Sequence, residues 1–402
     1  VEEYYGSEVT LHYPGLYAGA FHHGTYMLWF DRWFDRKLDG TYNTARCIRT
    51  VRAHETRDDY WLELDLEARY AAIAYPSGHY GGWYDTFLQG TLVGYDAYDR
   101  QVDAGVRGLS NVVIDPVGHC ASAGHMFPQN AVYGRSLIPI AQAYATFGLR
   151  PLVRPAIQDV TFYVMSSMDD AGLSVGGYWT SLEKFPEFVH RVYYAHADGG
   201  AYEHPPGETA DAAQTSTTYT YDPAHPAPTI GGNTLDADFY GDATCGPLDN
   251  QEVDARADVI SFETPRMVDP LYLTGPLSAT LFVGSDAVDT DFMVKITDVY
   301  PSGESRILQD NAVRMRWRGE IDGSSPTPGQ PVPMEAGAVY LVRMDLWNTS
   351  YVVAPNHSLR FSISRLGSNP NPTPTPNPNP TPKTNPYPNQ LQLPTLLCEP
   401  QQ

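Results

Sequence analysis

The carboxyl-terminal half of this sequence consists of short runs of β-branched and aromatic residues, separated by proline and glycine and without helical periodicity. Such runs are typical of short strands that end at tight turns. The clearest of them are residues 277–283, 292–296, 338–346 and 359–363. About eight strands in succession without helices favour two sheets packed face to face, in a sandwich or a jelly roll. From residue 206 to residue 402 we therefore expect an all-β unit.

Residues 71–205 have a different pattern, in which apolar runs alternate with a helical segment. The runs 71–75 and 111–115 each end at a proline, and residues 87–102 between them have helical periodicity. A strand, a helix and a second strand at this spacing predict a parallel βαβ unit, whose sheet is covered by helices. The run 160–165 predicts a further strand. The fold class that we expect for the chain is therefore α/β followed by all-β.

Two more segments carry strong patterns. Residues 1–70 contain aromatic and aliphatic side chains at spacings of three and four, notably at 26–36, which favours amphipathic helices. In the segment 369–388, proline stands at every second position from Pro370 to Pro382. Because proline fixes φ and has no amide N–H, we expect this segment to be extended or polyproline II.

The net charge of the chain limits the binding partners and the cellular locations that we expect for it. Acidic residues outnumber basic ones by 47 to 26, and the formal net charge is −21 at pH 7. That balance argues against nucleic acid and against anionic membrane surfaces. The sequence contains no apolar run of roughly 18 residues, so it predicts no membrane-spanning helix. Asn348 and Asn356 each begin an N-glycosylation sequon, and together with the acidity they favour an extracellular, glycosylated protein.

The four cysteines form neither a CxxC pair nor the spacing of a zinc site. An even number permits two disulfides, and the wide separation suggests one in each half of the chain. These disulfides would join Cys47 to Cys120 and Cys245 to Cys398. Four buried thiols are an equally good alternative.

Two short motifs follow the first two expected strands. Gly-Gly-Trp-Tyr-Asp ends at Asp85, and Asp-Pro-Val-Gly-His ends at His119. Because ligands bind outside the carboxyl ends of parallel strands, Asp85 and His119 are candidates for one site. An aspartate followed by a histidine is also the order of the last two triad residues in α/β-hydrolases, where the carboxylate orients the base of a serine nucleophile. From spacing alone, a capping aspartate and a buried histidine are the simpler interpretation.

The first motif, followed by Thr-Phe-Leu-Gln-Gly, resembles the acid-residue motif of the cocaine esterase and X-Pro dipeptidyl-peptidase family. That family also contains the α-amino-acid ester hydrolases and the glutaryl acylases. Further resemblances follow in the family's order at residues 58–61, 162–165, 179–186, 221–232, 285–292, 296–303 and 356–361. The resemblance implies a helical cap over residues 1–70, the later part of an α/β-hydrolase domain over 71–205, and a jelly-roll β-sandwich over 206–402.

The resemblance also implies roles for single residues. Asp85 corresponds to the triad carboxylate and His119 to the triad base, and their neighbours Trp83 and Tyr84 become candidates for lining the substrate pocket. The family's nucleophilic serine lies upstream of its cap, so we expect the nucleophile upstream of Val1.

The alternatives for a nucleophile inside the sequence are weak. A Gly-x-Ser-x-Gly string surrounds Ser174, but it follows both Asp85 and His119 and lies in an expected loop, so we interpret Ser174 as a turn residue. Cys120 directly follows His119, and neighbours in sequence rarely point at each other. The family's Gly-Pro-Trp before its histidine is replaced here by Asp115-Pro-Val-Gly, which changes the packing around the base.

The sequence therefore predicts a serine hydrolase-family protein that acts on a small ester or on an X-Pro peptide or amide, without a cofactor. The alternative is a catalytically inactive extracellular protein that self-associates into a fibre or a coat, or that binds glycans. The acidic clusters at 249–258 and 286–291 are more typical of a solvated surface and of turn caps than of metal ligands, so we expect no metal site.

Overall fold

The computed structural model of this protein describes part of the chain. The described residues are Ala53, 59–60, 67–73, 77–118, 158–167, 175–206, 217–222, 225–233, 245–319, 325–327, 330–364 and 390–396. Most of the predicted helical region 1–70 and all of the proline-rich segment 369–388 lie outside them. Among the described residues, no helix is both long and apolar enough to cross a bilayer, and no three metal-ligating side chains gather into a cluster.

The described elements are mostly strands. In chain order they are η2 (Glu67–Ala72), β1 (Gly78–Tyr84), α7 (Leu88–Gln101), β2 (Asn111–Gly118), β3 (Val160–Ser166), β4 (Tyr178–Leu182), β5 (Phe188–Ala195), β6 (Ala201–Tyr202), α10 (Gln251–Asp254), β7 (Ile260–Glu263), β8 (Leu271–Gly284), β9 (Asp291–Val299), β10 (Ser305–Arg314), η6 (Met315–Trp317), β11 (Val339–Val353), β12 (Ser358–Ser364) and β13 (Gln390–Leu396). They form a nine-stranded sheet with the order β1-β2-β3-β11-β8-β13-β5-β6, in which β4 pairs with β3, and a four-stranded sheet with the order β10-β9-β12-β7.

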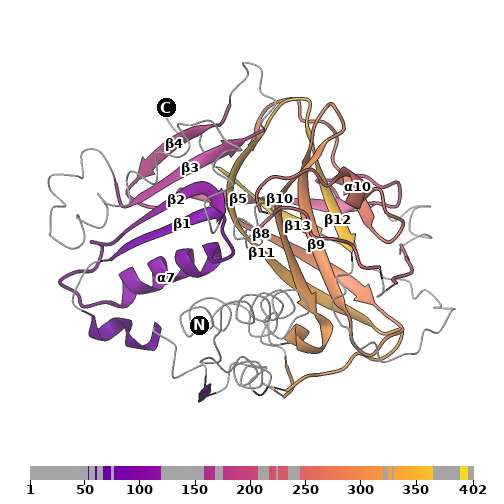
Figure 1. Cartoon of the computed structure of the whole chain (residues 1–402), viewed down its shortest axis with the longest axis horizontal. Coiled ribbons are helices and arrows are strands. Elements are labelled where there is room, and N and C mark those ends of the chain that lie inside the picture. Colours follow the sequence, from indigo (N-terminus) through magenta and orange to yellow (C-terminus); the bar gives the residue numbers. More distant parts are fainter. Residues whose placement is uncertain are drawn as a thin grey trace, which may run out of the picture.

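The predicted βαβ unit forms one end of the nine-stranded sheet. β1, β2 and β3 are parallel, and α7 lies along this end of the sheet (Figure 1). The prediction of the first strand at 71–75 was wrong, because Glu67–Ala72 form a 3₁₀ helix and the strand comes later. Glycines in β1 weaken its strand signal. Gly82 is nevertheless required there, since a Cβ at this position would lie 2.1 Å from the carbonyl oxygen of Val117 on β2.

The second strand is longer than predicted. β2 does not end at Pro116 but continues to Gly118, and all eight of its residues are buried. The pairing with β1 shifts register between Gly82 and Tyr84, opposite the proline, so that the ladder does not need the missing N–H. Asp115 is fully buried in this strand and accepts a hydrogen bond from the Tyr80 hydroxyl, which indicates a structural role.

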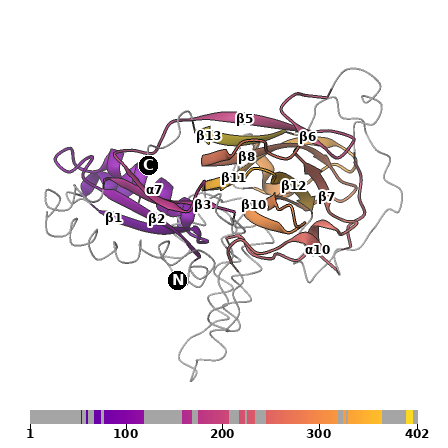
Figure 2. The same cartoon turned by 90° about the horizontal axis from the view of Figure 1, so that it is seen from above.

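The parallel end and the sandwich share one sheet. β3 pairs with β11 through Tyr351 opposite Met165 and Val352 opposite Ser166, and β11 pairs along its length with β8. Figures 1 and 2 show the α/β end on one side of the molecule and the packed sheets on the other. β5 and β6, which precede residue 206, pair within the sandwich part of this sheet. The composition change at residue 206 therefore does not coincide with a break in the sheet.

The prediction of a sandwich is confirmed. β8, β9 and β12 contain the predicted runs 277–283, 292–296 and 359–363, and β11 contains all but the first residue of the run 338–346. The four-stranded sheet lies over the β11-β8-β13 part of the large sheet (Figure 2). Buried side chains of both sheets, such as Leu273 and Ile296, belong to one hydrophobic cluster that also includes Trp83 and Phe162 of the α/β end. Burial of this continuous apolar surface holds the two parts together.

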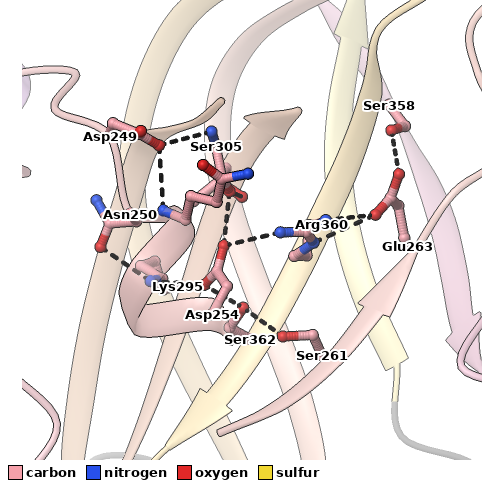
Figure 3. A network of polar contacts seen from close by, with 12 residues as sticks. Asp249, Asn250, Asp254, Ser261, Glu263, Lys295, Ser305, Ser358, Arg360 and Ser362 are labelled. Atoms are coloured by element: carbon pink, nitrogen blue, oxygen red, sulfur yellow. Dashed lines mark hydrogen bonds and ion pairs between the residues drawn. The ribbon is translucent and has the colours of Figure 1, made fainter. Parts of the chain in front are cut away.

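A buried network of charges attaches α10 to the four-stranded sheet (Figure 3). Asp254 lies 2.8 Å from the Lys295 ammonium and 3.1 Å from the Arg360 guanidinium, and it accepts hydrogen bonds from Ser305 and Ser362. Burial opposes the ionisation of Asp254, but the Lys295 charge and these hydrogen bonds outweigh it and lower the pKa of the carboxyl. A carboxylate with this many donors is satisfied inside the fold, so the network is structural.

Candidate active site

Asp85 lies directly after β1, at the edge where the parallel strands end. Its backbone N–H donates to the Gly82 carbonyl at 3.0 Å, and its Oδ1 accepts a hydrogen bond of 2.8 Å from the Phe87 N–H. This local turn orients the carboxylate at the start of α7, and the residue is half-buried. We refer to residues 83–89 as the Asp85 turn.

The end of β2, which precedes the second candidate in the sequence, lies beside the end of β1. Tyr84 pairs with Gly118, so the residues that follow them, Asp85 and His119, each continue from paired strand ends. His119 itself lies outside the described residues. Contact between the Asp85 carboxylate and the His119 ring therefore stays a prediction.

Trp83 and Tyr84 point into the core. They are 1% and 0% exposed, Trp83 Nε1 donates to the Tyr163 carbonyl at 2.7 Å, and the Tyr84 hydroxyl donates to the Ile307 carbonyl at 3.1 Å. Burial, with the nearby Tyr300 and Asp298, raises the pKa of Tyr84 well above its usual value, so the hydroxyl keeps its proton. In the described part of the chain, neither side chain reaches a surface from which it could contact a substrate.

The sandwich contacts the Asp85 turn through a glutamine that the sequence analysis did not single out. Gln309, on β10, is fully buried. Its Nε2 donates to the Trp83 carbonyl at 3.2 Å and to the Asn348 carbonyl at 3.0 Å. One amide group therefore joins the start of the Asp85 turn to β11.

A second contact reaches the other end of the turn. Asn348 Nδ2 donates to Gln89 Oε1 at 2.8 Å, and Gln89 Nε2 donates to Asp345 Oδ2 at 3.1 Å. We call the side chains of Gln89, Gln309 and Asn348 the amide clamp. Asn233 adds a longer hydrogen bond of 3.4 Å to the Asp85 carbonyl. Asn348 was predicted only as a glycosylation site, and no sequence motif marks Gln309. Gln89 lies in the Thr-Phe-Leu-Gln-Gly segment that follows the Asp85 motif, but no role was predicted for it.

One buried Ser–His–Asp group occurs elsewhere but does not have the geometry of a triad. Ser167 Oγ donates to Asp298 Oδ2 at 2.7 Å, while His357 Nδ1 lies 2.9 Å from Asp298 Oδ1 and 3.3 Å from Ser167 Oγ. In a triad the serine and the aspartate face different ring nitrogens, whereas here both meet Nδ1. All three residues are at most 3% exposed. The group joins the end of β3 to the sandwich.

The predicted cysteine pairs are only partly covered by the structure. Cys245 is buried, and a Cβ at Gly118 would lie 2.2 Å from its Sγ, so this cysteine packs against the end of β2. The other three cysteines lie outside the described residues. Both predicted disulfides therefore stay predictions.

The two candidate sequons lie in different environments. Asn348 uses its amide in the clamp and precedes the fully buried Thr349 and Ser350, so a glycan there would displace the contact with Gln89. Asn356 is exposed in the turn between β11 and β12, with φ at 66°. Of the two, Asn356 has the accessibility that modification requires.

Comparison with known proteins supports the same architecture. A family described as the X-Pro dipeptidyl-peptidase C-terminal non-catalytic domain matches residues 158–401. Cocaine esterase from Rhodococcus sp. (strain MB1 Bresler) is 31% identical over 335 residues. That match covers 79% of this chain and 53% of cocaine esterase, so the chain spans about half the length of this curated relative.

Solved structures show the same fold at lower identity. An α-amino acid ester hydrolase superposes with a TM-score of 0.64 at 18% identity, covering 98% of this chain and 66% of that one. An aminopeptidase from a marine sediment Thaumarchaeota archaeon superposes with a TM-score of 0.61 at 18% identity, covering 95% and 63% respectively.

The fold defines a class of architecture: a parallel α/β sheet that continues into a carboxyl-terminal β-sandwich. Within that class, the chain belongs to the cocaine esterase and X-Pro dipeptidyl-peptidase family, and it contains that family's C-terminal non-catalytic domain. The family resemblance that the sequence motifs predicted is thereby confirmed.

Proposed function

We propose that this chain supplies the acid and the base of a serine hydrolase that cleaves small esters or X-Pro peptides and amides. Asp85 is the triad carboxylate and His119 the base, and the nucleophilic serine comes from a segment upstream of Val1. The observation that carries the proposal is the position of Asp85, half-buried after a parallel strand and oriented by the Phe87 N–H. The identity to cocaine esterase supports the ester as substrate class.

In the proposed chemistry Asp85 keeps its charge throughout, and His119 takes up and returns a proton in each of the two half-reactions. Asp85 accepts the Nδ1–H of His119, which fixes the tautomer and stabilises the imidazolium. His119 Nε2 takes the hydroxyl proton as the serine oxygen attacks the acyl carbon, and a tetrahedral intermediate forms. Collapse expels the alcohol or amine, which receives the proton from His119, and leaves an acyl-serine. His119 then takes a proton from water as the water oxygen attacks the acyl carbon, and it returns that proton to the serine oxygen as the acyl–serine bond breaks and the acid leaves.

The test is hydrolysis of a p-nitrophenyl ester by the protein extended upstream to include the proposed serine. We expect Asp85→Asn and His119→Ala to lower kcat by about 10³- to 10⁴-fold. Asp286→Asn is the matched control, because it removes the same charge from an exposed turn of the sandwich. Full activity of either triad variant would refute the proposal.

The proposal also covers the connectivity of the sandwich, the cellular location of the protein and its glycosylation. We infer that the sandwich has the jelly-roll connectivity of the family, and that the protein is extracellular and carries a glycan at Asn356. The exposed position of Asn356 supports the glycan. Loss of mass on treatment with an N-glycosidase, abolished by Asn356→Gln, would establish that modification, and an unchanged mass would contradict it.

The second candidate function is self-association of an inactive chain. It is favoured by one observation: within the described residues, β1 lies at the edge of the nine-stranded sheet. An edge strand is a template for pairing with another chain. This candidate predicts sedimentation coefficients that rise with concentration and are indifferent to His119→Ala, together with the absence of serine labelling by a fluorophosphonate.

A further inference from the structure

Side chains of the sandwich contact the Asp85 turn at its first and at its last residue. Gln309 bonds the carbonyl of Trp83, two residues before Asp85, and Asn348 bonds the side chain of Gln89, four residues after it. Both partners belong to the sandwich, in β10 and β11. The Asp85 turn cannot shift relative to β10 and β11 without breaking one of these contacts.

The side-chain amide of Gln309 donates two hydrogen bonds. Its Nε2 serves two backbone carbonyls, and its Oε1 is buried without a hydrogen-bond partner among the described residues. A buried amide oxygen without a partner costs free energy. Gln309 therefore keeps an unsatisfied buried oxygen while its amide nitrogen joins the carbonyls of Trp83 and Asn348.

The backbone of β11 is distorted where Asn348 leaves it. The pairing of β11 with β8 shifts register between Asp345 and Asn348, which marks a β-bulge. Within the bulge Trp347 has φ at 69°, a left-handed conformation that is strained for a bulky residue. The Trp347 N–H donates to Asp345 Oδ1 at 2.7 Å and so stabilises the distortion. The bulge presents the Asn348 side chain to Gln89 of α7 and its carbonyl to Gln309.

We propose that Gln309 and Asn348 of the sandwich are positioning residues for Asp85, so that the domain described as non-catalytic sets the orientation of the triad acid. This inference rests on the proposed function. The clamp fixes the Asp85 turn, and with it the direction of the carboxylate that, in the proposed triad, accepts the His119 Nδ1–H. If the turn shifts, the carboxylate stabilises the imidazolium less, and the pKa of the histidine falls.

The test uses the ester-hydrolysing protein that includes the upstream serine segment. Asn348→Asp places an acceptor against Gln89 Oε1, and Asp345→Asn places a donor against Gln89 Nε2. We expect each single variant to lower kcat by about tenfold to a hundredfold with little change in KM, because misplacement of a catalytic group by about 1 Å has effects of this size. The acid limb of the pH profile should move to lower pH.

The double variant Asp345→Asn with Asn348→Asp provides the rescue. Gln89 can then turn its amide over, donating to the new carboxylate and accepting from the new amide, while the oxygen at position 345 still accepts from the Trp347 N–H. We expect kcat and the acid limb to return close to the wild-type values. The matched control is Ser362→Ala, which removes a buried hydrogen bond to Asp254 in the network of Figure 3, far from the Asp85 turn in sequence and contacts.

The outcomes separate the two proposals. If Asp85→Asn leaves kcat unchanged, the proposed function fails and the positioning role fails with it. If Asp85→Asn abolishes activity but the single clamp variants have the kcat and pH profile of Ser362→Ala, only the positioning role is refuted. Should a single variant fail to fold, Asn348→Ala removes the donor without adding a charge, and a wild-type acid limb in that variant would also refute the role.

Discussion

Replacement of Asp310 by asparagine is expected to change the pH dependence of folding stability. Asp310 lies on β10 opposite Lys295 of β9 and is 8% exposed. Its Oδ2 accepts no hydrogen bond from any described residue, and the Lys295 ammonium is directed to Asp254 and Asn250 instead. Burial raises the pKa of Asp310 from 3.8 to about 7, against the smaller opposing effect of Lys295.

The sign follows from proton linkage. Because the pKa is higher in the folded than in the unfolded protein, the folded state binds the proton more tightly. The resulting stability is complete below about pH 4 and is lost as the pH rises through about 7. Between pH 5 and pH 8, this single group should remove about 2 to 3 kcal/mol of stability from the wild-type protein. Asp310→Asn does not titrate, so it should gain that amount relative to wild type over the same interval.

The assay is urea denaturation of wild type and variant at pH 5, 6, 7 and 8. Comparing the two proteins at each pH cancels the titration of groups that do not interact with Asp310; Lys295, which faces it, is the exception. Any pH-independent cost of the amide cancels in the change from pH 5 to pH 8. Asp286→Asn, at an exposed position, should show a constant difference from wild type. A difference for Asp310→Asn that is equally flat would refute the reasoning.

Three further predictions concern packing and buried polar groups. Gly82→Ala should prevent folding or destabilise the protein by more than about 3 kcal/mol in urea denaturation, because its Cβ would collide with the Val117 carbonyl oxygen. Gly94→Ala in α7 should instead stabilise the protein by up to about 1 kcal/mol, because its Cβ would meet only the Tyr70 hydroxyl, at 3.8 Å. Asp254→Ala should cost about 3 to 5 kcal/mol at pH 7, since it leaves the buried Lys295 without its carboxylate partner, and a loss below about 1 kcal/mol would contradict the network. Ser167→Ala should lower stability by about 1 to 3 kcal/mol yet leave ester hydrolysis and serine labelling intact, and loss of labelling would identify this serine as a nucleophile after all.

Local sequence patterns were sufficient for the coarse organisation. The helix predicted at 87–102 and the strand at 160–165 agree with α7 and β3, because amphipathic periodicity and β-branched content report burial within one element. Patterns failed where a tertiary neighbour overrode propensity. The glycine-rich β1 is a strand because β2 approaches its backbone closely, and β2 continues through Pro116 because the register shifts beside it.

One part of the candidate site could likewise be predicted from the sequence, and the other part could not. The strand-end Asp85 was identified from its motif, since the residues that form the turn are consecutive. The amide clamp was not identifiable, because the Gln309 side chain lies 226 residues from Trp83 along the chain, and Asn348 lies 259 residues from Gln89. A glutamine in a strand and an asparagine in a sequon carry no local signal of such contacts.

The sequence by itself determined the family, the order of α/β and all-β parts, and the motif that makes Asp85 the candidate acid. These properties depend on neighbouring residues and on their periodicity. Only the tertiary structure decided that β3 pairs with β11, so that both parts share one sheet. It also decided that side chains of the sandwich form hydrogen bonds with the Asp85 turn. The physical reason is that hydrogen-bond partners and register are selected by which distant strands are buried against each other, and no local pattern encodes that choice.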